Sequence, residues 1–253
     1  MILLVAAIGA GLVAFAHMAP VAFLIEALQR DESVWHLPVD PAAPAVYLTY
    51  DDGPNPTATP LLLDVLRDAG ASATFFLIDD HVTDETAPLV RRMFDEGHTV
   101  ALHSNERWLM LRTPEAIAGA LRDAADRIEQ LAGSRPCPYF RPHAGWRSGA
   151  LYAALDLLDY RMAGWSWGLW DWNWWRPHEA AALAERLAGR ARAGDIIVMH
   201  DGHHRDPRAD RRYAVEATAR LIPALQARQL RLERLPCAVT PRPASRPGAA
   251  GPE

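Results

Sequence analysis

Short strand-like runs alternate with longer helix-like segments along the chain from about residue 41. Seven runs have the length and apolar character of strands: residues 46–50, 73–78, 99–102, 139–141, 161–165, 196–199 and 230–235. Six segments between them are typical of helices: residues 57–69, 85–96, 114–131, 148–158, 177–193 and 214–228. Strands that alternate with helices predict parallel β-structure built from βαβ units. Seven repeats favour a closed or nearly closed α/β barrel over a short open sheet.

The segment at residues 114–131 has the clearest boundaries of the predicted helices. Thr113 is a preferred capping residue, and Pro114 suits the first helical position. Glu115 adds an acidic residue to the first turn. Gly133 follows the end of the segment, where a residue in the left-handed conformation is wanted.

The first 25 residues contain no Asp, Glu, Lys or Arg and are rich in Leu, Val, Ala and Ile. This stretch is long enough to span a bilayer as one helix. Ala14-Phe15-Ala16 has the spacing of a signal-peptide cleavage site, but no Lys or Arg precedes the apolar core, which continues past that site. An uncleaved membrane anchor is therefore favoured over a secretion signal or a buried helix. The few flanking charges leave its orientation open.

The same pattern divides the chain into four parts: an anchor or signal segment (1–26), a linker (27–42), a folded domain (43–236) and a tail (237–253) rich in Pro, Ala, Arg and Gly. We expect the tail to be disordered. The formal net charge of −5, with no basic stripe, argues against a nucleic-acid binder. Cys137 and Cys237 permit one disulfide without demanding it. Cys137 opens a strand-like run and is expected to be a small core residue, so the redox compartment stays open.

Reactive side chains follow successive predicted strands at their carboxyl ends. Asp51 and Asp52 come directly after the first strand. Later strand ends carry His103, Arg141, Asp171 and His200. Each of these residues alone has a structural explanation, such as an acidic turn or a capped loop histidine. Because parallel α/β folds collect their chemistry at the carboxyl ends of the strands, the whole set predicts a catalytic site.

The adjacent carboxylates of Asp51 and Asp52 also predict a cation in this site. A neighbouring anion raises the pKa of a carboxyl group, so two like charges side by side are costly. A metal ion or another strong cation removes the conflict by holding one carboxylate ionised while the other works as a base.

Five short sequences carry most of these residues: Thr49-Tyr50-Asp51-Asp52-Gly53-Pro54, Gly97-His98 with His103-Ser104, Arg141-Pro142-His143-Ala144-Gly145, Asp171-Trp172, and Val198-Met199-His200-Asp201. They resemble the motifs of polysaccharide deacetylases of the NodB-homology class, carbohydrate esterase family 4. The resemblance covers roughly residues 43–236. It implies a distorted seven-stranded (β/α) barrel. It also implies the metal-assisted hydrolysis of an N-acetyl, sometimes O-acetyl, group on a sugar.

The resemblance also implies roles for the acidic and histidine residues. Asp51 is the general base, and Asp52 and His103 are ligands of a divalent metal, zinc or similar. Such an ion polarises the acyl carbonyl and lowers the pKa of its water, while Asp51 takes the proton. His200 is the general acid for the departing amine, which requires a group with a pKa near neutrality.

Three further residues have supporting roles in the same resemblance. Arg141 pairs with Asp171 and orients the general base. The backbone N–H of Ala144, where the family usually has Tyr, supplies an oxyanion contact that needs no side chain.

Arg107 departs from the family pattern, because it stands four residues after His103 where the family has a second metal-binding histidine. A guanidinium group only donates hydrogen bonds and cannot bind a metal. Three interpretations stay open. Either Arg107 replaces the charge of the metal beside Asp52, or the domain holds sugars without hydrolysing them, or a substitute ligand completes the site. Candidates for that ligand are Glu106, Asn105, a water, His143, and His203 and His204, whose polar loop is more typical of a solvated segment.

Six tryptophans crowd a short span, more than one barrel wall can bury: Trp165, Trp167, Trp170, Trp172, Trp174 and Trp175. Alternation suits Trp165 and Trp167 to a strand. We expect at least one of the other four to lie near the mouth of the site and to stack on a pyranose ring, with packing or membrane-surface contact as the alternatives. Gly168 is a further departure, because many family members have an acidic residue in that region.

The sequence thus predicts a hydrolase that removes acetyl groups, N-acetyl above all, from a sugar of a cell-envelope or extracellular polysaccharide. The alternative is a membrane-anchored, glycan-binding domain without activity. The presence together of Asp51, Arg141, Asp171 and His200 favours the enzyme. The expected partners are an acetylated glycan and, through the N-terminal segment, a membrane, with the domain outside the cytoplasm or else secreted or periplasmic. The identity of the glycan stays open.

Overall fold

The computed structural model describes residues 33–168 and 179–237. In this part of the chain nine strands form one sheet, and every pairing between them is parallel. The strands are β1 (Ser33–Val34), β2 (Ala45–Gly53), β3 (Thr74–Ile78), β4 (Thr99–His103), β5 (Tyr139–Arg141), β6 (Arg161–Ala163), β7 (Trp167–Gly168), β8 (Ile196–His200) and β9 (Arg231–Glu233). The expected parallel α/β architecture is confirmed. The two-residue strands β1 and β7 are additions to it.

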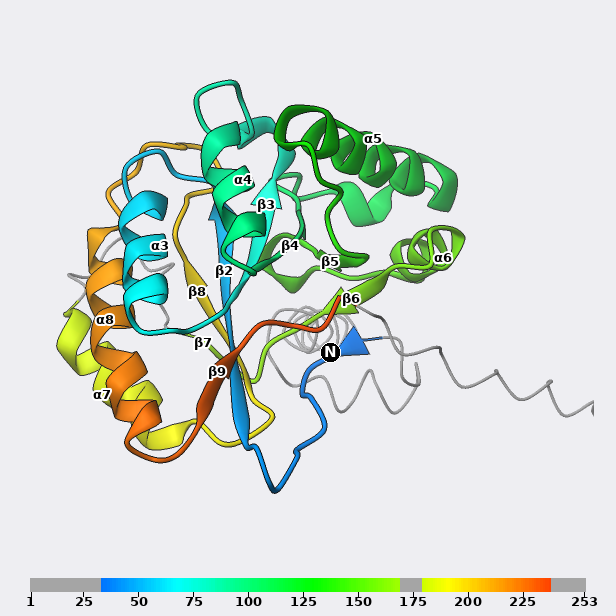
Figure 1. Cartoon of the computed structure of the whole chain (residues 1–253). Coiled ribbons are helices and arrows are strands. Elements are labelled where there is room, and N and C mark those ends of the chain that lie inside the picture. The colour runs from blue at the N-terminus through cyan, green and yellow to red at the C-terminus, as the bar shows by residue number, and fades with distance from the viewer. Residues whose placement is uncertain (1–32, 169–178, 238–253) are drawn as a thin grey trace, which may run out of the picture.

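The strands lie in the order β1-β6-β5-β4-β3-β2-β8-β7, and β9 also pairs with β2 (Figure 1). The long β2 makes this possible, because its first residues pair with β9 and its last residues pair with β3. On its other edge β2 pairs with β8 over most of its length. The carboxyl ends of β2, β4, β5 and β8 therefore meet at one end of the sheet.

In the described ranges six α-helices connect the strands and lie on the outside of the sheet (Figure 1). They are α3 (Thr59–Asp68), α4 (Ala87–Asp95), α5 (Pro114–Ala132), α6 (Gly149–Leu157), α7 (Ala180–Arg190) and α8 (Arg212–Gln226). The predicted boundaries of α5 are confirmed. The side chain of Thr113 accepts a hydrogen bond from the backbone N–H of Ala116, and Gly133 ends the helix with a φ of 80°.

Apolar side chains cover both faces of the strands. Phe75 and Leu102 lie in the main core cluster together with helix residues such as Leu63. Their chain neighbours Phe76 and Ala101 lie in a second cluster. Successive strand residues point to opposite faces, so strands that are covered on both sides have nearly continuous apolar sequences. The second cluster joins residues from β1 to β8, which shows that the sheet curls around it as a barrel-like interior.

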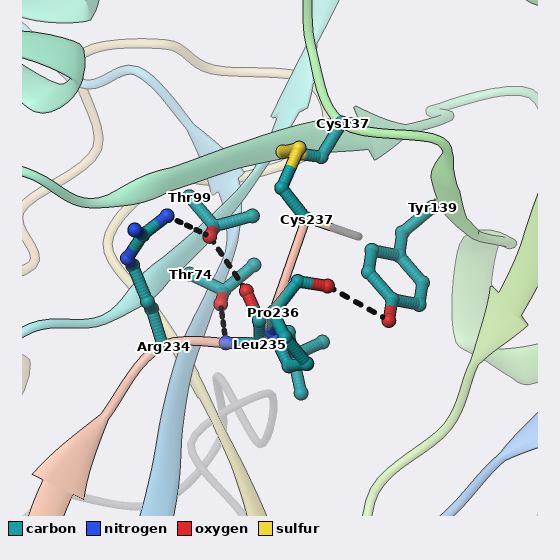
Figure 2. The surroundings of a disulfide bond; sticks show 8 residues. All are labelled: Thr74, Thr99, Cys137, Tyr139, Arg234, Leu235, Pro236 and Cys237. Carbon is teal, nitrogen blue, oxygen red and sulfur yellow. Dashed lines mark hydrogen bonds between the residues drawn. A yellow bond between two sulfur atoms is a disulfide. The ribbon is translucent and has the colours of Figure 1, made fainter. Parts of the chain in front are cut away.

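The C-terminal segment after β9 crosses the end of the sheet opposite to the carboxyl ends of the strands (Figure 2). Its backbone at Leu235 is hydrogen-bonded to Thr74 and Thr99, the first residues of β3 and β4. A disulfide then joins Cys237 to Cys137 just before β5, with 5.3 Å between the two Cα atoms. Cys137 is buried as expected, but it is bonded to Cys237 rather than simply packed as a small core side chain.

No helix in the described ranges is long and apolar enough to cross a membrane. The apolar stretch at residues 1–25 and the tail beyond Cys237 lie outside the described residues. The anchor therefore stays a prediction.

Candidate active site

Strand β2 ends in a β-bulge that separates the side chains of its two carboxylates. Asp51 lies opposite Phe76 of β3, and Gly53 lies opposite the next residue, Leu77, so that Asp52 is the extra residue. Asp52 has a φ of 67°, a conformation that costs a non-glycine residue of order 1–3 kcal/mol and that recurs at functional sites. Bulges redirect side chains, and here two consecutive acidic residues acquire different partners.

The loop after β8 holds this bulge in place. The backbone N–H of Gly202 donates to the carbonyl oxygen of Asp51 over 3.3 Å. A Cβ atom on Gly202 would stand 1.9 Å from the carbonyl oxygen of Asp52, so only glycine fits there. From the other side, a ring nitrogen of His81 lies 3.1 Å from the same Asp52 oxygen. The backbone of Asp52 is thus fixed by two separate segments.

Asp51 is bound by the fully buried guanidinium of Arg141. One nitrogen of Arg141 donates to a carboxylate oxygen of Asp51 over 2.6 Å and to the Thr49 hydroxyl over 2.8 Å. The other donors reach the backbone carbonyls of Ala163 and Gly164. Burial lowers the pKa of Arg141, and the ion pair with Asp51 opposes that shift. Arg141 therefore orients Asp51 by direct contact.

Asp52 faces His103, the last residue of β4. One carboxylate oxygen of Asp52 lies 3.2 Å from Nε2 of His103, and both side chains are buried. Nδ1 of His103 lies 2.6 Å from the backbone carbonyl of Arg141, which only accepts, so Nδ1 carries a proton. In the neutral tautomer Nε2 then presents a lone pair to the carboxylate, and two acceptors facing each other require a cation between them.

The pKa shifts of Asp52 and His103 also indicate that a cation is favourable between them. Burial raises the pKa of Asp52, but the contact with His103 outweighs it and the pKa lies well below its usual value. Burial lowers the pKa of His103, and the contact with Asp52 again outweighs it, so the pKa is raised. Both groups thus favour their charged forms, and the pair binds a proton when no other cation is there.

The Asp52–His103 pair also fits a divalent metal. A carboxylate oxygen and an imidazole nitrogen are both common zinc ligands, and a ligating histidine normally donates its other N–H to a carbonyl, as His103 does to Arg141. The Asp52 oxygen that faces His103 is buried and accepts no other hydrogen bond from the described residues. In the described ranges, however, no three His, Cys, Asp or Glu side chains are close enough together to hold a metal as they stand.

Arg107 lies close to His143. It lines a small pocket together with Glu106, His143 and Trp146. Glu106, one of the candidate substitute ligands, is engaged in an ion pair with Arg112 at 2.7 Å.

Four imidazole rings, which we call the histidine row, lie next to one another at the mouth of the site: His103, His143, His204 and His203. The distances between successive ring centres are 6.4, 5.0 and 4.5 Å. Burial lowers the pKa of His143 to about 4 and also lowers those of His203 and His204. The fold thus brings three of the candidate substitute ligands to the site in their neutral form.

His200, the expected general acid, ends β8 directly opposite Asp51 in the strand register. It is partly buried. Its neighbour Asp201 is fully buried and accepts a hydrogen bond from the hydroxyl of Thr59. Burial raises the pKa of Asp201 to about 7. Ala144, the expected oxyanion residue, lies in the turn after β5 with a φ of 52°.

Several predicted site residues lie outside the described residues: Asp171, Trp170, Trp172, Trp174 and Trp175. The expected pairing of Arg141 with Asp171 therefore stays a prediction. Trp165 packs against Trp35, with 6.0 Å between ring centres, and also lies near the guanidinium of Arg141. The indole N–H of Trp167 donates to Asp195. Both tryptophans make structural contacts, but only Trp167 lies in a strand, because β6 ends at Ala163 and Trp165 stands in the segment before β7.

Two tryptophans that the sequence reasoning missed lie at the rim. Trp108 is 58% exposed, and its ring centre is 6.3 Å from that of Trp146. Trp146 lines the same pocket as Arg107 and His143. Their sequence signal was available, because each stands in a loop that follows a strand ending in a candidate site residue.

Comparisons with known proteins agree with this geometry. The family model described as polysaccharide deacetylase matches residues 39–163. A chitooligosaccharide deacetylase of Sinorhizobium fredii is 34% identical over 207 residues, covering 77% of this chain and 91% of that protein. A peptidoglycan-N-acetylglucosamine deacetylase of Bacillus cereus is 31% identical over 182 residues, covering 72% of this chain and 81% of that protein.

The fold of the described residues is also similar to a solved structure. A family 4 acetyl xylan esterase from Clostridium thermocellum, in complex with a cobalt ion, superposes with a TM-score of 0.65 and 28% identity. The match covers 75% of this chain and 87% of that one. The expected fold class, a (β/α) barrel of the NodB-homology type, is confirmed.

Proposed function

We propose that this chain, which belongs to the polysaccharide deacetylase family, hydrolyses the N-acetyl groups of a cell-envelope polysaccharide. The observation that carries the proposal is the arrangement at the end of β2, where Asp51 is bound by buried Arg141 while Asp52 faces His103. Two adjacent carboxylates with different partners suit two different roles.

Asp51 is the general base in this proposal. It takes a proton from the attacking water, and Arg141 keeps its carboxylate oriented toward the site during the transfer. His200, opposite Asp51 on the neighbouring strand, donates a proton to the departing amine. The backbone N–H of Ala144 supports the oxyanion. A divalent metal on Asp52 and His103 supplies Lewis acidity to the acyl carbonyl when it is bound.

The substrate class in the proposal is a polymer of N-acetylglucosamine. Similar proteins are named as deacetylases of chitooligosaccharide and of peptidoglycan N-acetylglucosamine. Trp108 supports a glycan substrate, because its exposed indole ring, which lies next to the partly buried ring of Trp146, offers a flat apolar face to a pyranose ring beside the site. The similar acetyl xylan esterase makes an O-acetyl substrate the alternative to be tested.

The disulfide supports a location outside the cytoplasm. Structural disulfides persist in oxidising compartments and are rare in the cytosol. The Cys137–Cys237 bond joins two segments of the folded domain and so supports a location in such a compartment. This agrees with the predicted N-terminal membrane anchor, and a secreted or periplasmic protein is the alternative.

Acetate release tests the function directly. The full-length protein is assayed on N-acetyl chitooligosaccharide, peptidoglycan and acetyl xylan, first after chelation and then with added Zn²⁺ or Co²⁺. We expect acetate from the N-acetylated glycans and its loss on chelation. Folded, metal-loaded protein that releases no acetate but still binds these glycans would instead support a glycan-binding domain without activity, one of the three interpretations that Arg107 leaves open.

A further inference from the structure

The Asp52–His103 pair leaves the candidate metal centre one protein ligand short. Catalytic zinc sites usually have three protein ligands and an open position for water. Here one carboxylate and one imidazole face each other, and the side chain four residues beyond His103 is the guanidinium of Arg107. A third ligand has to be a neutral donor that lies close to this pair.

We propose that His143 is the third protein ligand, so that Asp52, His103 and His143 together hold the metal. This inference rests on the proposed function. His143 follows β5, and β5 pairs with β4 in a register that places Arg141 opposite His103. The ring of His143 therefore lies just beyond the end of the neighbouring strand, 6.4 Å from the His103 ring between centres.

The ring of His143 lies only slightly too far from the ring of His103 for both to bind one metal ion. Zinc–nitrogen bonds of about 2.0–2.1 Å in tetrahedral geometry separate two ligating imidazole centres by roughly 5 Å. His143 thus needs to approach by about 1.4 Å, which a rotation of its side chain provides. Within the described ranges no hydrogen bond holds its ring, and the residue is only partly buried. Its ring can turn toward Asp52 without breaking a contact of this kind.

The other members of the histidine row are placed differently. Nδ1 of His203 accepts hydrogen bonds from the backbone N–H groups of Arg205 and Asp206, at 3.3 and 3.1 Å, which fixes this ring in its own loop. His204 lies between His203 and His143, with its ring centre 5.0 Å from that of His143. In the row, His204 therefore lies one ring further from His103 than His143 does.

Direct metal binding tests the inference without relying on activity. Zn²⁺ is titrated calorimetrically into the metal-stripped full-length protein, and the absorption spectrum of the Co²⁺ form reports the ligand set. We expect His143→Gln to weaken Zn²⁺ binding by at least about tenfold and to change the Co²⁺ spectrum. The matched control is His203→Gln, a histidine of the same row, which should bind Zn²⁺ within about twofold of the wild type. Circular dichroism establishes that each variant is folded.

A second pair of variants separates this inference from the proposed function. His103→Gln should lose most Zn²⁺ binding, and adding Arg107→His to the His143→Gln variant should restore binding by placing an imidazole in the pocket that Arg107 and His143 share. Wild-type binding by His143→Gln, with binding lost in His103→Gln, would overturn the inference and leave the proposed deacetylase intact. If His143→Gln and His103→Gln both bound Zn²⁺ like the wild type, the whole metal assignment would be overturned. Acetate release by the wild type tests the proposed function separately.

Discussion

Neighbouring residues of one strand acquire opposite tasks in this protein because their surroundings differ. Asp51 is hydrogen-bonded to the buried guanidinium of Arg141. Asp52 faces the imidazole of His103, whose lone pair and the carboxylate can both bind a cation. The positive φ of Asp52 sets the direction of its side chain and is tolerated because Gly202 and His81 hold its backbone. An energetically unfavourable backbone conformation of this kind is typical of residues at functional sites.

Two histidines at opposite ends of β4 show how position decides role. His103 ends the strand at the site, while His98 precedes it at the far end and accepts a hydrogen bond from the backbone N–H of Ala73 over 3.2 Å. Burial lowers the pKa of His98 to about 4 from an ordinary value of 6.5. His98 is therefore a structural histidine that the fold keeps neutral, although it belongs to a sequence motif of the family.

His98 predicts a loss of stability in acid. Between pH 6.5 and pH 4 the unfolded chain protonates this histidine and the folded chain does not, so the free energy of unfolding falls as the pH falls through that window. Above pH 6.5 the imidazole is neutral in both states and contributes no pH dependence. We expect the wild type to lose about 1–2 kcal/mol more than His98→Asn between pH 6.5 and pH 5.

Urea unfolding of both proteins at pH 7.5, 6.5 and 5 provides this measurement. Asn keeps an acceptor for the N–H of Ala73 and does not titrate, so it is the matched variant. Equal slopes of stability against pH in the two proteins would contradict the assignment of a neutral, buried His98.

At the scale of elements, the contact between the loop after β8 and the bulge of β2 is the critical one. Gly202 lies against the backbone of Asp52, where a methyl group would meet the carbonyl at 1.9 Å. We expect Gly202→Ala to displace Asp52 and to lower kcat/KM by roughly 10²-fold, because small displacements of catalytic groups have effects of that size.

Gly119→Ala is the matched control for this substitution. Gly119 lies inside α5, and a Cβ atom there would meet nothing within 4 Å. Alanine is the better helix former, so this variant should gain about 0.5–1 kcal/mol of stability and keep its activity. Steady-state kinetics and thermal unfolding of both variants measure the difference. A Gly202→Ala enzyme with wild-type kinetics would refute the role of this contact.

The regular elements could be predicted from the sequence because their signals are local. Apolar runs and capping residues such as Thr113 place the longer strands and α5 within a few residues of their observed ends. The two-residue strands β1 and β7 are too short to produce a periodic pattern. The bulge at Asp52 was also missed, because it depends on the pairing of β2 with β3.

The positions of Asp51, Asp52, His103, Arg141 and His200 could be predicted because parallel strands bring their carboxyl ends together. The contacts between these side chains could not be predicted from the sequence. The direct bond from Arg141 to Asp51 and the row formed by His143, His203 and His204 depend on loop conformations that no local pattern encodes. The same holds for the meeting of Trp108 with Trp146.

At the scale of the whole molecule, the site and the disulfide occupy opposite ends of the sheet. The segment that ends at Cys237 crosses the starts of β3 and β4, and Tyr139 at the start of β5 donates to the carbonyl of Pro236 (Figure 2). This segment therefore lies across the end of the sheet at which β3, β4 and β5 begin. The disulfide-linked segment that stabilises the domain and the candidate active site are thus at opposite ends of the sheet.

The disulfide predicts a variant that is less stable but still active. Cys137 and Cys237 are 100 residues apart in the sequence, so their bond restricts the unfolded chain strongly. We expect the double variant Cys137→Ala/Cys237→Ala to lose about 2–5 kcal/mol of unfolding free energy. Below its melting temperature it should keep its kcat, because the bond lies far from Asp51.

Denaturant unfolding of the oxidised wild type, the reduced wild type and the double variant measures this loss. The reduced wild type is the control, since it breaks the same bond without removing side chains and should match the double variant. A double variant as stable as the oxidised protein would show that the crossing segment is held by its hydrogen bonds and packing alone.

In the proposed mechanism Asp51 is the base and Asp52 holds the cation, so a substitution of Asp51 alone separates the two roles. Acetate release from an N-acetylated chitooligosaccharide is measured for the metal-loaded wild type and for Asp51→Asn, with Zn²⁺ affinity determined on the same samples. We predict that Asp51→Asn lowers kcat by about 10²–10⁴-fold and leaves Zn²⁺ affinity nearly unchanged. An Asp51→Asn protein that releases acetate at the wild-type rate would contradict the account.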